Sequence, residues 1–110
     1  MTVGDENLVS IVRGLISRNP DDREEASETV CDWLNSFDRR EVKMISALLS
    51  SLVVLETESD CRESELHALS ELTETGFIEA GDLAPLWQIR RDTLRGSEVE
   101  HFDYLAGEYS

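Results

Sequence analysis

The sequence predicts an all-α domain, and three observations support this prediction. Apolar residues recur at steps of three and one along most of the chain, as they do on one face of an amphipathic helix. Residues that favour helix starts stand before these apolar segments. No segment reads as a strand, because the nearest one, LVVLET at 52–57, continues a helical stripe. A length of 110 residues with 40% hydrophobic composition suits one domain with one modest core.

The start signals divide the chain into six helices. These are expected near residues 5–18, 20–37, 39–55, 59–75, 82–94 and 97–108. The first carries Leu8, Ile11 and Leu15 on its apolar face. Asn19 followed by Pro20 begins the second, because Asn is a good cap and Pro suits the first helical position. Two capping boxes, in which an acid three residues after the cap binds back to it, begin the third and sixth helices: Asp38 with Glu41, and Ser97 with Glu100.

The fourth and fifth helices are marked by single residues at their ends. Thr57 or Ser59 begins the fourth, and Gly76 suits its C-terminal cap, where a left-handed conformation favours glycine. Asp82 is expected to cap the fifth helix, which has Pro85 in its first turn.

The chain is strongly acidic, with 24 Asp and Glu against 10 Lys and Arg and a formal net charge of −14. This charge repels nucleic acid and anionic membranes, so neither is expected as a partner. The longest apolar stretch, LVVL at 52–55, is far shorter than the ~20 residues of a membrane span, and the N-terminus lacks an export signal. A cytoplasmic location is therefore expected. Cys31 and Cys61 form no C-x-x-C motif and are expected to be free thiols.

An internal repeat relates the two halves of the first 75 residues. An offset of 39 aligns Asp21 with Asp60, Arg23 with Arg62, Glu24 with Glu63, Val30 with Leu69, Asp32 with Glu71 and Trp33 with Leu72. The helices that precede these segments align at an offset of 37, which makes the second connection two residues longer. A repeat of this length is typical of helical stacks.

The repeated segments carry a resemblance to a known family. REEASETVCDW at 23–33 and RESELHALSEL at 62–72 resemble the second helix of HEAT repeats, in which Arg precedes small and apolar residues at helical spacing. The NP pair at 19–20 occupies the place of that family's frequent Asp-Pro. The resemblance covers residues 5–75 and extends to 82–110 by analogy. It implies a stack of about three antiparallel helix pairs, whose second helices line a concave face.

The sequence also predicts the environments of one glutamate and of several aromatic residues. Glu65 departs from the HEAT pattern, because the family prefers a small residue where the first repeat has Ala26. Glu65 is therefore expected either to hold a buried ion pair or to tilt toward solvent. Trp33 and Trp87 fall on apolar stripes and are expected in the core. Three aromatic residues crowd the last helix and either close the core or anchor an interface: Phe102, Tyr104 and Tyr109.

The acidic residues concentrate on the second helix of each pair. Residues 19–38 hold seven Asp or Glu against one Arg, and residues 56–82 hold nine against one, whereas 39–55 is net basic. When Val30 and Leu69 face the core, helical periodicity turns many of these acids outward or to the flank. The candidate partner-binding residues are Asp21, Glu25, Glu28, Asp32, Asp60, Glu63, His67, Glu71 and Glu74.

Two interpretations of this acidic surface are open. A charged stripe is often only the solvated face of a helix, and acids in a first turn, such as Asp21 and Asp60, favour the helix dipole. Solvated faces, however, usually interleave Glu with Lys four residues apart. Glu25, Glu28 and Asp32 have no such partner, and like charges at that spacing cost about 0.2–0.5 kcal/mol each. The pattern therefore favours a surface that a basic partner neutralises.

Catalytic motifs are absent from the sequence. It holds no G-x-S-x-G, P-loop or H-E-x-x-H motif, and its two histidines, His67 and His101, read as surface residues. The His-Glu pairs of iron-binding HEAT-like hydroxylases and the basic groove of HEAT-like DNA glycosylases are also missing. We therefore expect neither enzymatic activity nor a metal or cofactor.

These observations lead to a functional hypothesis. Small acidic single-domain proteins of this kind resemble bacterial immunity proteins, which neutralise a cognate toxin nuclease by covering its basic cleft. The alternatives are a HEAT-type scaffold or adaptor that binds a helix or peptide and, least favoured, an enzyme that uses the acidic cluster with a divalent metal.

Overall fold

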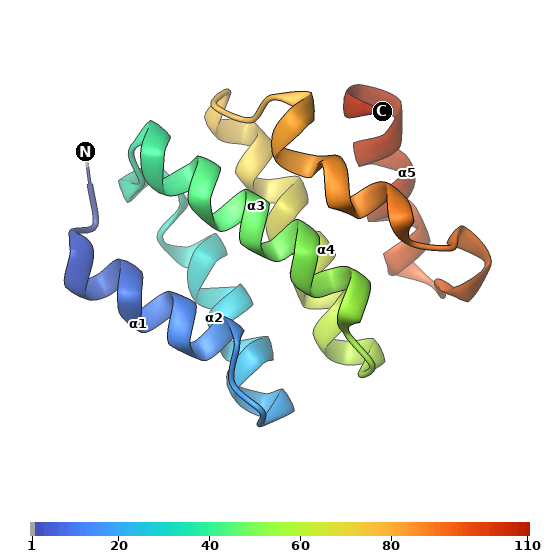
Figure 1. Cartoon of the computed structure of the whole chain (residues 1–110), viewed down its shortest axis with the longest axis horizontal. Helices are drawn as coiled ribbons and strands as arrows, with labels where there is room; N and C mark the ends of the chain where they lie inside the picture. The colour runs from blue at the N-terminus through green and yellow to red at the C-terminus, as the bar shows by residue number, and fades with distance from the viewer. Residues whose placement is uncertain (1) are drawn as a thin grey trace.

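The computed structural model, which describes residues 2–110, arranges the helices in two layers (Figure 1), and the apolar stripes are buried between them. One layer contains α1 (Asp5–Leu15), α3 (Arg39–Leu55) and the 3-10 helix η3 (Ala80–Gln88). The other contains α2 (Pro20–Asp32), α4 (Ser59–Leu72) and α5 (Ser97–Tyr109). Three single-turn 3-10 helices lie in the connections: η1 (Leu34–Ser36), η2 (Thr73–Thr75) and η4 (Arg91–Thr93).

The chain alternates between the two layers as it advances along the stack. α1 packs on α2 and α3 packs on α4, while within the second layer α4 contacts both α2 and α5. The molecule measures 38 × 30 × 19 Å, and its shortest dimension corresponds to two layers of helices. The predicted all-α fold is confirmed, and no strand occurs in residues 2–110. The finer assignment to HEAT repeats stays a prediction, because any antiparallel helix pair needs similar apolar stripes.

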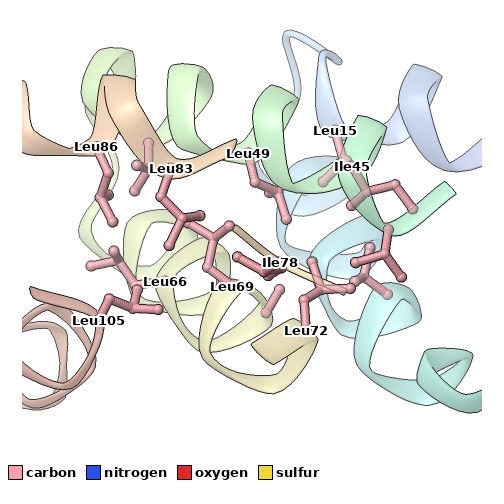
Figure 2. Close-up of a cluster of buried hydrophobic side chains, with 14 of the residues drawn as sticks. Leu15, Ile45, Leu49, Leu66, Leu69, Leu72, Ile78, Leu83, Leu86 and Leu105 are labelled. Carbon is pink, nitrogen blue, oxygen red and sulfur yellow. The ribbon is translucent and has the colours of Figure 1, made fainter. Parts of the chain in front are cut away.

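Leucine and isoleucine from both layers fill the core (Figure 2). Val30 and Leu69, the equivalent positions of the internal repeat, have no exposed surface. The largest fully buried apolar side chains are Leu15, Ile45, Leu49, Leu66, Leu69, Leu72, Leu83, Leu86 and Leu105. Because these residues come from five of the six long helices, the layers can be held together by burial of apolar surface.

Most of the predicted helix ends agree with the structure. The Asn19 side chain caps α2 by accepting from the Asp21 N–H at 2.9 Å, and Asp38 with Glu41 forms the predicted capping box of α3. α4 begins at Ser59, and η2 continues it to Gly76, which has the left-handed φ of 76°. Such a φ is open to glycine at little steric cost.

Two of the predicted helices are shorter than expected. α1 ends at Leu15 rather than near 18, because residues 16–19 form the turn to α2, in which Asn19 before Pro20 has an extended backbone. α2 ends at Asp32 rather than near 37. The backbone is extended at Phe37, which places its ring in the core just before the cap of α3.

The predicted helix near 82–94 is wrong in type and in bounds. A 3-10 helix begins instead at Ala80, with Glu79 as its cap and Asp82 as the third residue of a capping box. Pro85 lies inside it, and proline has no N–H to donate to the carbonyl four residues earlier, which disfavours an α-helix here. The cap of α5 also differs from its prediction: Gly96 takes that position, and Ser97 is the first helical residue.

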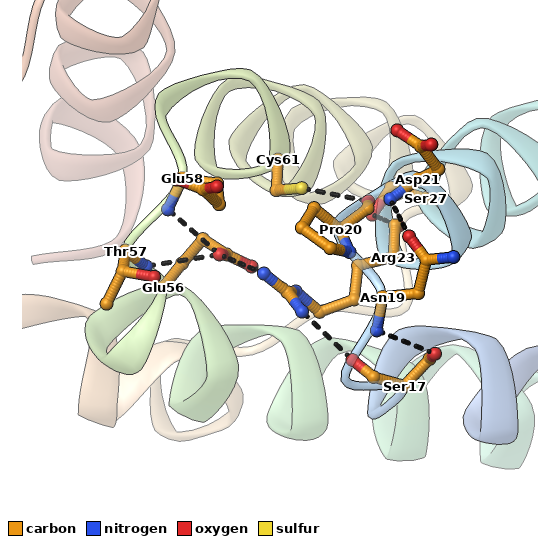
Figure 3. A network of polar contacts seen from close by, with 10 residues as sticks. All are labelled: Ser17, Asn19, Pro20, Asp21, Arg23, Ser27, Glu56, Thr57, Glu58 and Cys61. Carbon is orange, nitrogen blue, oxygen red and sulfur yellow. Dashed lines mark hydrogen bonds and ion pairs between the residues drawn. The ribbon is translucent and has the colours of Figure 1, made fainter.

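Two arginine ion pairs tie helices of the second layer to neighbouring segments, and the first joins α2 to Glu56 at the C-terminal cap of α3 (Figure 3). Arg23 of α2 donates from Nε and Nη2 to the two oxygens of Glu56, both at 2.8 Å, and from Nη1 to the Ser17 carbonyl at 3.0 Å. Arg62, at the equivalent position of α4, pairs with Glu98 in the first turn of α5. The equivalent arginines of the two repeats thus both form an ion pair with a glutamate.

The structure also tests the expectations for Glu65, for the two tryptophans and for the aromatic residues of α5. Glu65 is fully buried and its carboxyl has no hydrogen-bond partner in the described residues, so both expectations for it, the ion pair and the tilt to solvent, are wrong. Trp33 is 37% exposed rather than in the core, because α2 has ended before it. Trp87 packs edge-on against Phe102 with ring centroids 5.8 Å apart. Tyr104 is exposed, whereas Tyr109 packs against the core.

Candidate functional site

The two layers differ sharply in charge. Helices α1, α3 and η3 together hold four acidic and four basic residues, whereas α2, α4 and α5 hold fourteen Asp or Glu and two Arg. Both arginines, Arg23 and Arg62, are mostly buried in their ion pairs with Glu56 and Glu98. The solvent side of the second layer therefore presents many carboxylates and, from its own helices, no available cation. We call this surface the acidic face, and it consists of the exposed and half-buried acids of α2, α4 and α5.

The candidate residues on α2 are all exposed, and they border different grooves. Asp21, Glu25, Glu28 and Asp32 point to solvent, as helical periodicity predicted. Glu25 borders a groove between α1 and α2. Glu28 and Asp32 border a second groove, between α2 and α4. The α2 carboxylates therefore border grooves on both sides of the helix.

The candidate residues on α4 are less uniformly exposed. Asp60 and His67 are exposed, whereas Glu63 and Glu71 are half-buried. Glu74 is exposed but lies in η2, beyond the end of α4, and borders none of the grooves described here. Eight of the nine candidate residues therefore lie on α2 and α4, which pack side by side.

The groove between α2 and α4 has a volume of about 390 Å³ and joins the two helices. Its lining residues are Ser27, Glu28, Cys31, Asp32, Glu63, Ser64 and His67. His67 Nε2 lies 3.2 Å from Glu71 Oε1, and His67 Nδ1 lies 4.0 Å from Cys31 Sγ. The groove thus combines carboxylates, an imidazole and small polar side chains.

A second histidine extends this cluster to α5. The His101 and His67 rings lie 5.2 Å apart between centroids, and His101 Nε2 is 3.1 Å from Glu63 Oε1. His101 was not among the predicted site residues. No signal in the sequence connects it to His67, because the contact depends on how α5 packs on α4.

The acids at the helix starts can have a purely structural role. Asp21 and Glu24 of α2 border a depression with Glu58 and Asp60 at the start of α4. Acids in a first turn interact favourably with the positive end of the helix dipole. The charges of this depression are therefore explained without a partner.

The acids at the helix ends have no such explanation. Asp32 is the last residue of α2, and Glu71 is the last but one of α4, where the dipole disfavours negative charge. Neither helix has a basic residue in its last turn. Apart from the contact of His67 with Glu71, the carboxylates of Glu28, Asp32 and Glu71 form no ion pair within residues 2–110.

The α5 side of the acidic face is partly neutralised. Arg91 of η4 donates to both carboxylate oxygens of Asp103, at 2.8 and 2.7 Å. Compensation therefore occurs at this edge, whereas none of the six acids of α2 forms an ion pair within residues 2–110.

The cysteines do not form a reactive centre. Both are free, as predicted. Burial, with help from neighbouring carboxylates, raises the pKa of Cys31 and that of Cys61 to about 11. Since the thiolate is the nucleophilic form, both side chains are protonated and unreactive near neutral pH.

No group of three or more His, Cys, Asp or Glu in residues 2–110 is arranged to hold a metal ion. None of the helices described is both long and apolar enough to cross a bilayer. Neither the protein-family models, nor the curated proteins, nor the solved structures with which the chain was compared match it.

Proposed function

We propose that this protein is a cytoplasmic binding protein, without catalytic activity, whose acidic face engages a basic protein partner. One observation carries the proposal: the uncompensated carboxylates at the ends of α2 and α4. Glu28 and Asp32 lie four residues apart on α2 and line the α2–α4 groove, and Glu71 lies near the end of the neighbouring helix α4. This arrangement costs free energy in the isolated protein, both through like-charge repulsion and through the helix dipole. A basic surface docked on it would remove that cost.

The partner class that fits this surface best is a toxin nuclease, with this protein as its immunity protein. A nuclease binds phosphates through clustered Lys and Arg. Carboxylates arranged on a helical face can occupy such a cleft in place of the phosphates. Opposite charges speed association, and apolar anchors slow release. Trp33 and Tyr104 supply exposed aromatic surface for such anchors.

A second candidate function is a scaffold that binds a helix or peptide. The grooves on both sides of α2 favour it, because elongated clefts between helices accept extended or helical segments. The two candidate functions differ in how much of this protein's surface the partner covers. An immunity complex buries much of the acidic face, whereas a peptide occupies one groove.

Charge reversal tests the proposal. The test variant exchanges Glu25, Glu28 and Asp32 together for Lys. The wild type and the variant are each used to capture partners from the native cell. The fold should persist, because all three side chains are exposed. Capture of a basic partner should be lost, since like charges at an interface cost several kcal/mol.

The matched control reverses Asp5 and Glu6, two exposed acids of the first layer. This variant should retain the partner. Equal capture by the wild type and the triple variant would remove the acidic face from the interface. The partner's size then separates a folded toxin domain from a short peptide.

A further inference from the structure

A groove of about 280 Å³ lies between α1 and α2, at the end of the stack and away from the α2–α4 groove. Its small lining residues explain why it is hollow: Ser10 and Gly14 of α1 face Ala26 and Thr29 of α2. Gly14 and Ala26 bring the helices so close that a Cβ on Gly14 would lie 2.7 Å from the Ala26 Cβ.

The walls of the groove combine apolar and anionic groups. Ile11 lies at its buried side, and the exposed ring of Trp33 lines it at the C-terminal end of α2. Asp22 and Glu25 line it nearer the start of α2. From residue 22 to residue 33 the helix rises about 16 Å, which is the length of roughly five extended residues.

The two carboxylates have no cation from residues 2–110. Asp22 accepts a hydrogen bond from Ser17 Oγ at 2.8 Å, and neither Asp22 nor Glu25 forms an ion pair within residues 2–110. Arg23, between them in sequence, is turned away into its pair with Glu56. Arg13 lies on a different depression of α1.

We propose that this groove receives a short arginine-rich segment of the basic partner, about four to six residues long. Guanidinium groups would pair with Asp22 and Glu25, and one would stack on the indole of Trp33. Arginine suits the site better than lysine, because its planar head both binds carboxylates with two hydrogen bonds and stacks on aromatic rings. This inference rests on the proposed function, since it supplies the specific anchor that the diffuse charge of the acidic face lacks.

The test follows the two tryptophan indole N–H signals of the ¹⁵N-labelled protein by NMR during titration with acetylated, amidated tetra-arginine at low salt. Trp33 lines the groove, and Trp87, packed on Phe102, is an internal reference. The Trp33 signal should shift saturably while the Trp87 signal stays in place. A tetra-citrulline peptide, which keeps the shape but not the charge, should produce no saturable shift.

Two substitutions on the same helix provide the matched pair. Glu25→Gln removes a charge from this groove, whereas Glu28→Gln removes one from the α2–α4 groove. The first should weaken tetra-arginine binding about fivefold, as for loss of one ion pair, and the second by no more than about twofold.

The possible outcomes separate this inference from the proposed function. Saturable backbone shifts on α2 and α4 with an unmoved Trp33 signal, or equal effects of the two substitutions, would overturn the groove assignment and leave the acidic face intact. Equal binding of tetra-citrulline would also overturn it. Absence of any shift with tetra-arginine at low salt would overturn both.

Discussion

Glu65 on α4 shows how strongly one buried acid can shape the behaviour of this protein. Its side chain is fully buried and unpartnered, and burial, together with the neighbouring Glu56 carboxylate, raises its pKa to about 9. Glu56 behaves in the opposite way. Burial acts to raise its pKa, but the hydrogen bonds from Arg23 outweigh burial and lower it to about 2. At neutral pH the first acid is therefore protonated and the second ionised.

The raised pKa of Glu65 predicts that the stability of the folded protein depends on pH. The substitution Glu65→Gln should remove this dependence. The folded protein keeps the Glu65 proton between the ordinary glutamate pKa and about pH 9, whereas the unfolded chain releases it. The contribution of Glu65 to stability is thus fully present below pH 4.5 and is lost as the pH rises toward 9. Glu65→Gln, which imitates the protonated side chain, should match the wild type near pH 4 and exceed it by about 1 kcal/mol or more at pH 8.

Urea denaturation of both proteins between pH 4 and pH 9 measures this effect. Glu56 does not interfere, because its depressed pKa makes it lose its contribution only as the pH falls from 4.5 toward 2. Glu74→Gln, at an exposed position, is the control and should follow the wild type throughout. A stability difference between Glu65→Gln and the wild type that stays constant across this range would show that Glu65 is ionised in the folded protein.

At the scale of the helices, the equivalent positions of the repeat lie in the core. Val30 of α2 and Leu69 of α4 are fully buried, and their helices pack on each other. Between them the two side chains also fix which faces of α2 and α4 turn outward. The position of Glu28 and Asp32 at the groove is a consequence of that packing.

Truncation of these two residues tests the core. Val30→Ala and Leu69→Ala should each cost about 2–4 kcal/mol of unfolding free energy, because each leaves a cavity that the neighbouring helices cannot close. Leu55→Ala is the control, since Leu55 is 76% exposed and its truncation should cost under about 0.5 kcal/mol. Denaturant titration gives all three values. Losses no larger than that of the control at both core positions would contradict the equivalence of the two repeats.

At the scale of the whole molecule, the formal net charge of −14 is concentrated on one of the two layers. Such self-repulsion destabilises a compact state, and salt screens it, since the Debye length falls from about 30 Å at 0.01 M to about 10 Å at 0.1 M. Stability and partner association should therefore respond to salt in opposite directions.

The melting temperature should consequently rise by roughly 4 °C or more between 10 mM and 500 mM NaCl, as a gain of about 1 kcal/mol would produce. Each Lys replacement in the triple variant of Glu25, Glu28 and Asp32 adds two charges, so its net charge is −8 and its melting temperature should rise less. Scanning calorimetry at several salt concentrations measures both. A melting temperature that falls with added salt in the wild type would show that attractive ion pairs outweigh the repulsion on the acidic face.

The sequence by itself determined the fold class, most of the helix starts and the outward direction of the acids on α2. These properties depend on neighbours within one or two helical turns, such as Asn19 beside Pro20 or Asp38 three residues before Glu41. They are therefore readable from local periodicity and capping.

The tertiary structure alone decided which side chains meet across helices. It separated Glu25 from Glu28 onto different grooves, exposed Trp33, buried Glu65 without a partner and placed His101 against His67. Each of these outcomes depends on how close two helices approach and on the residue at which a helix stops. Such distances are set by packing between different helices, such as α1 with α2 and α4 with α5, which no local pattern in the chain records.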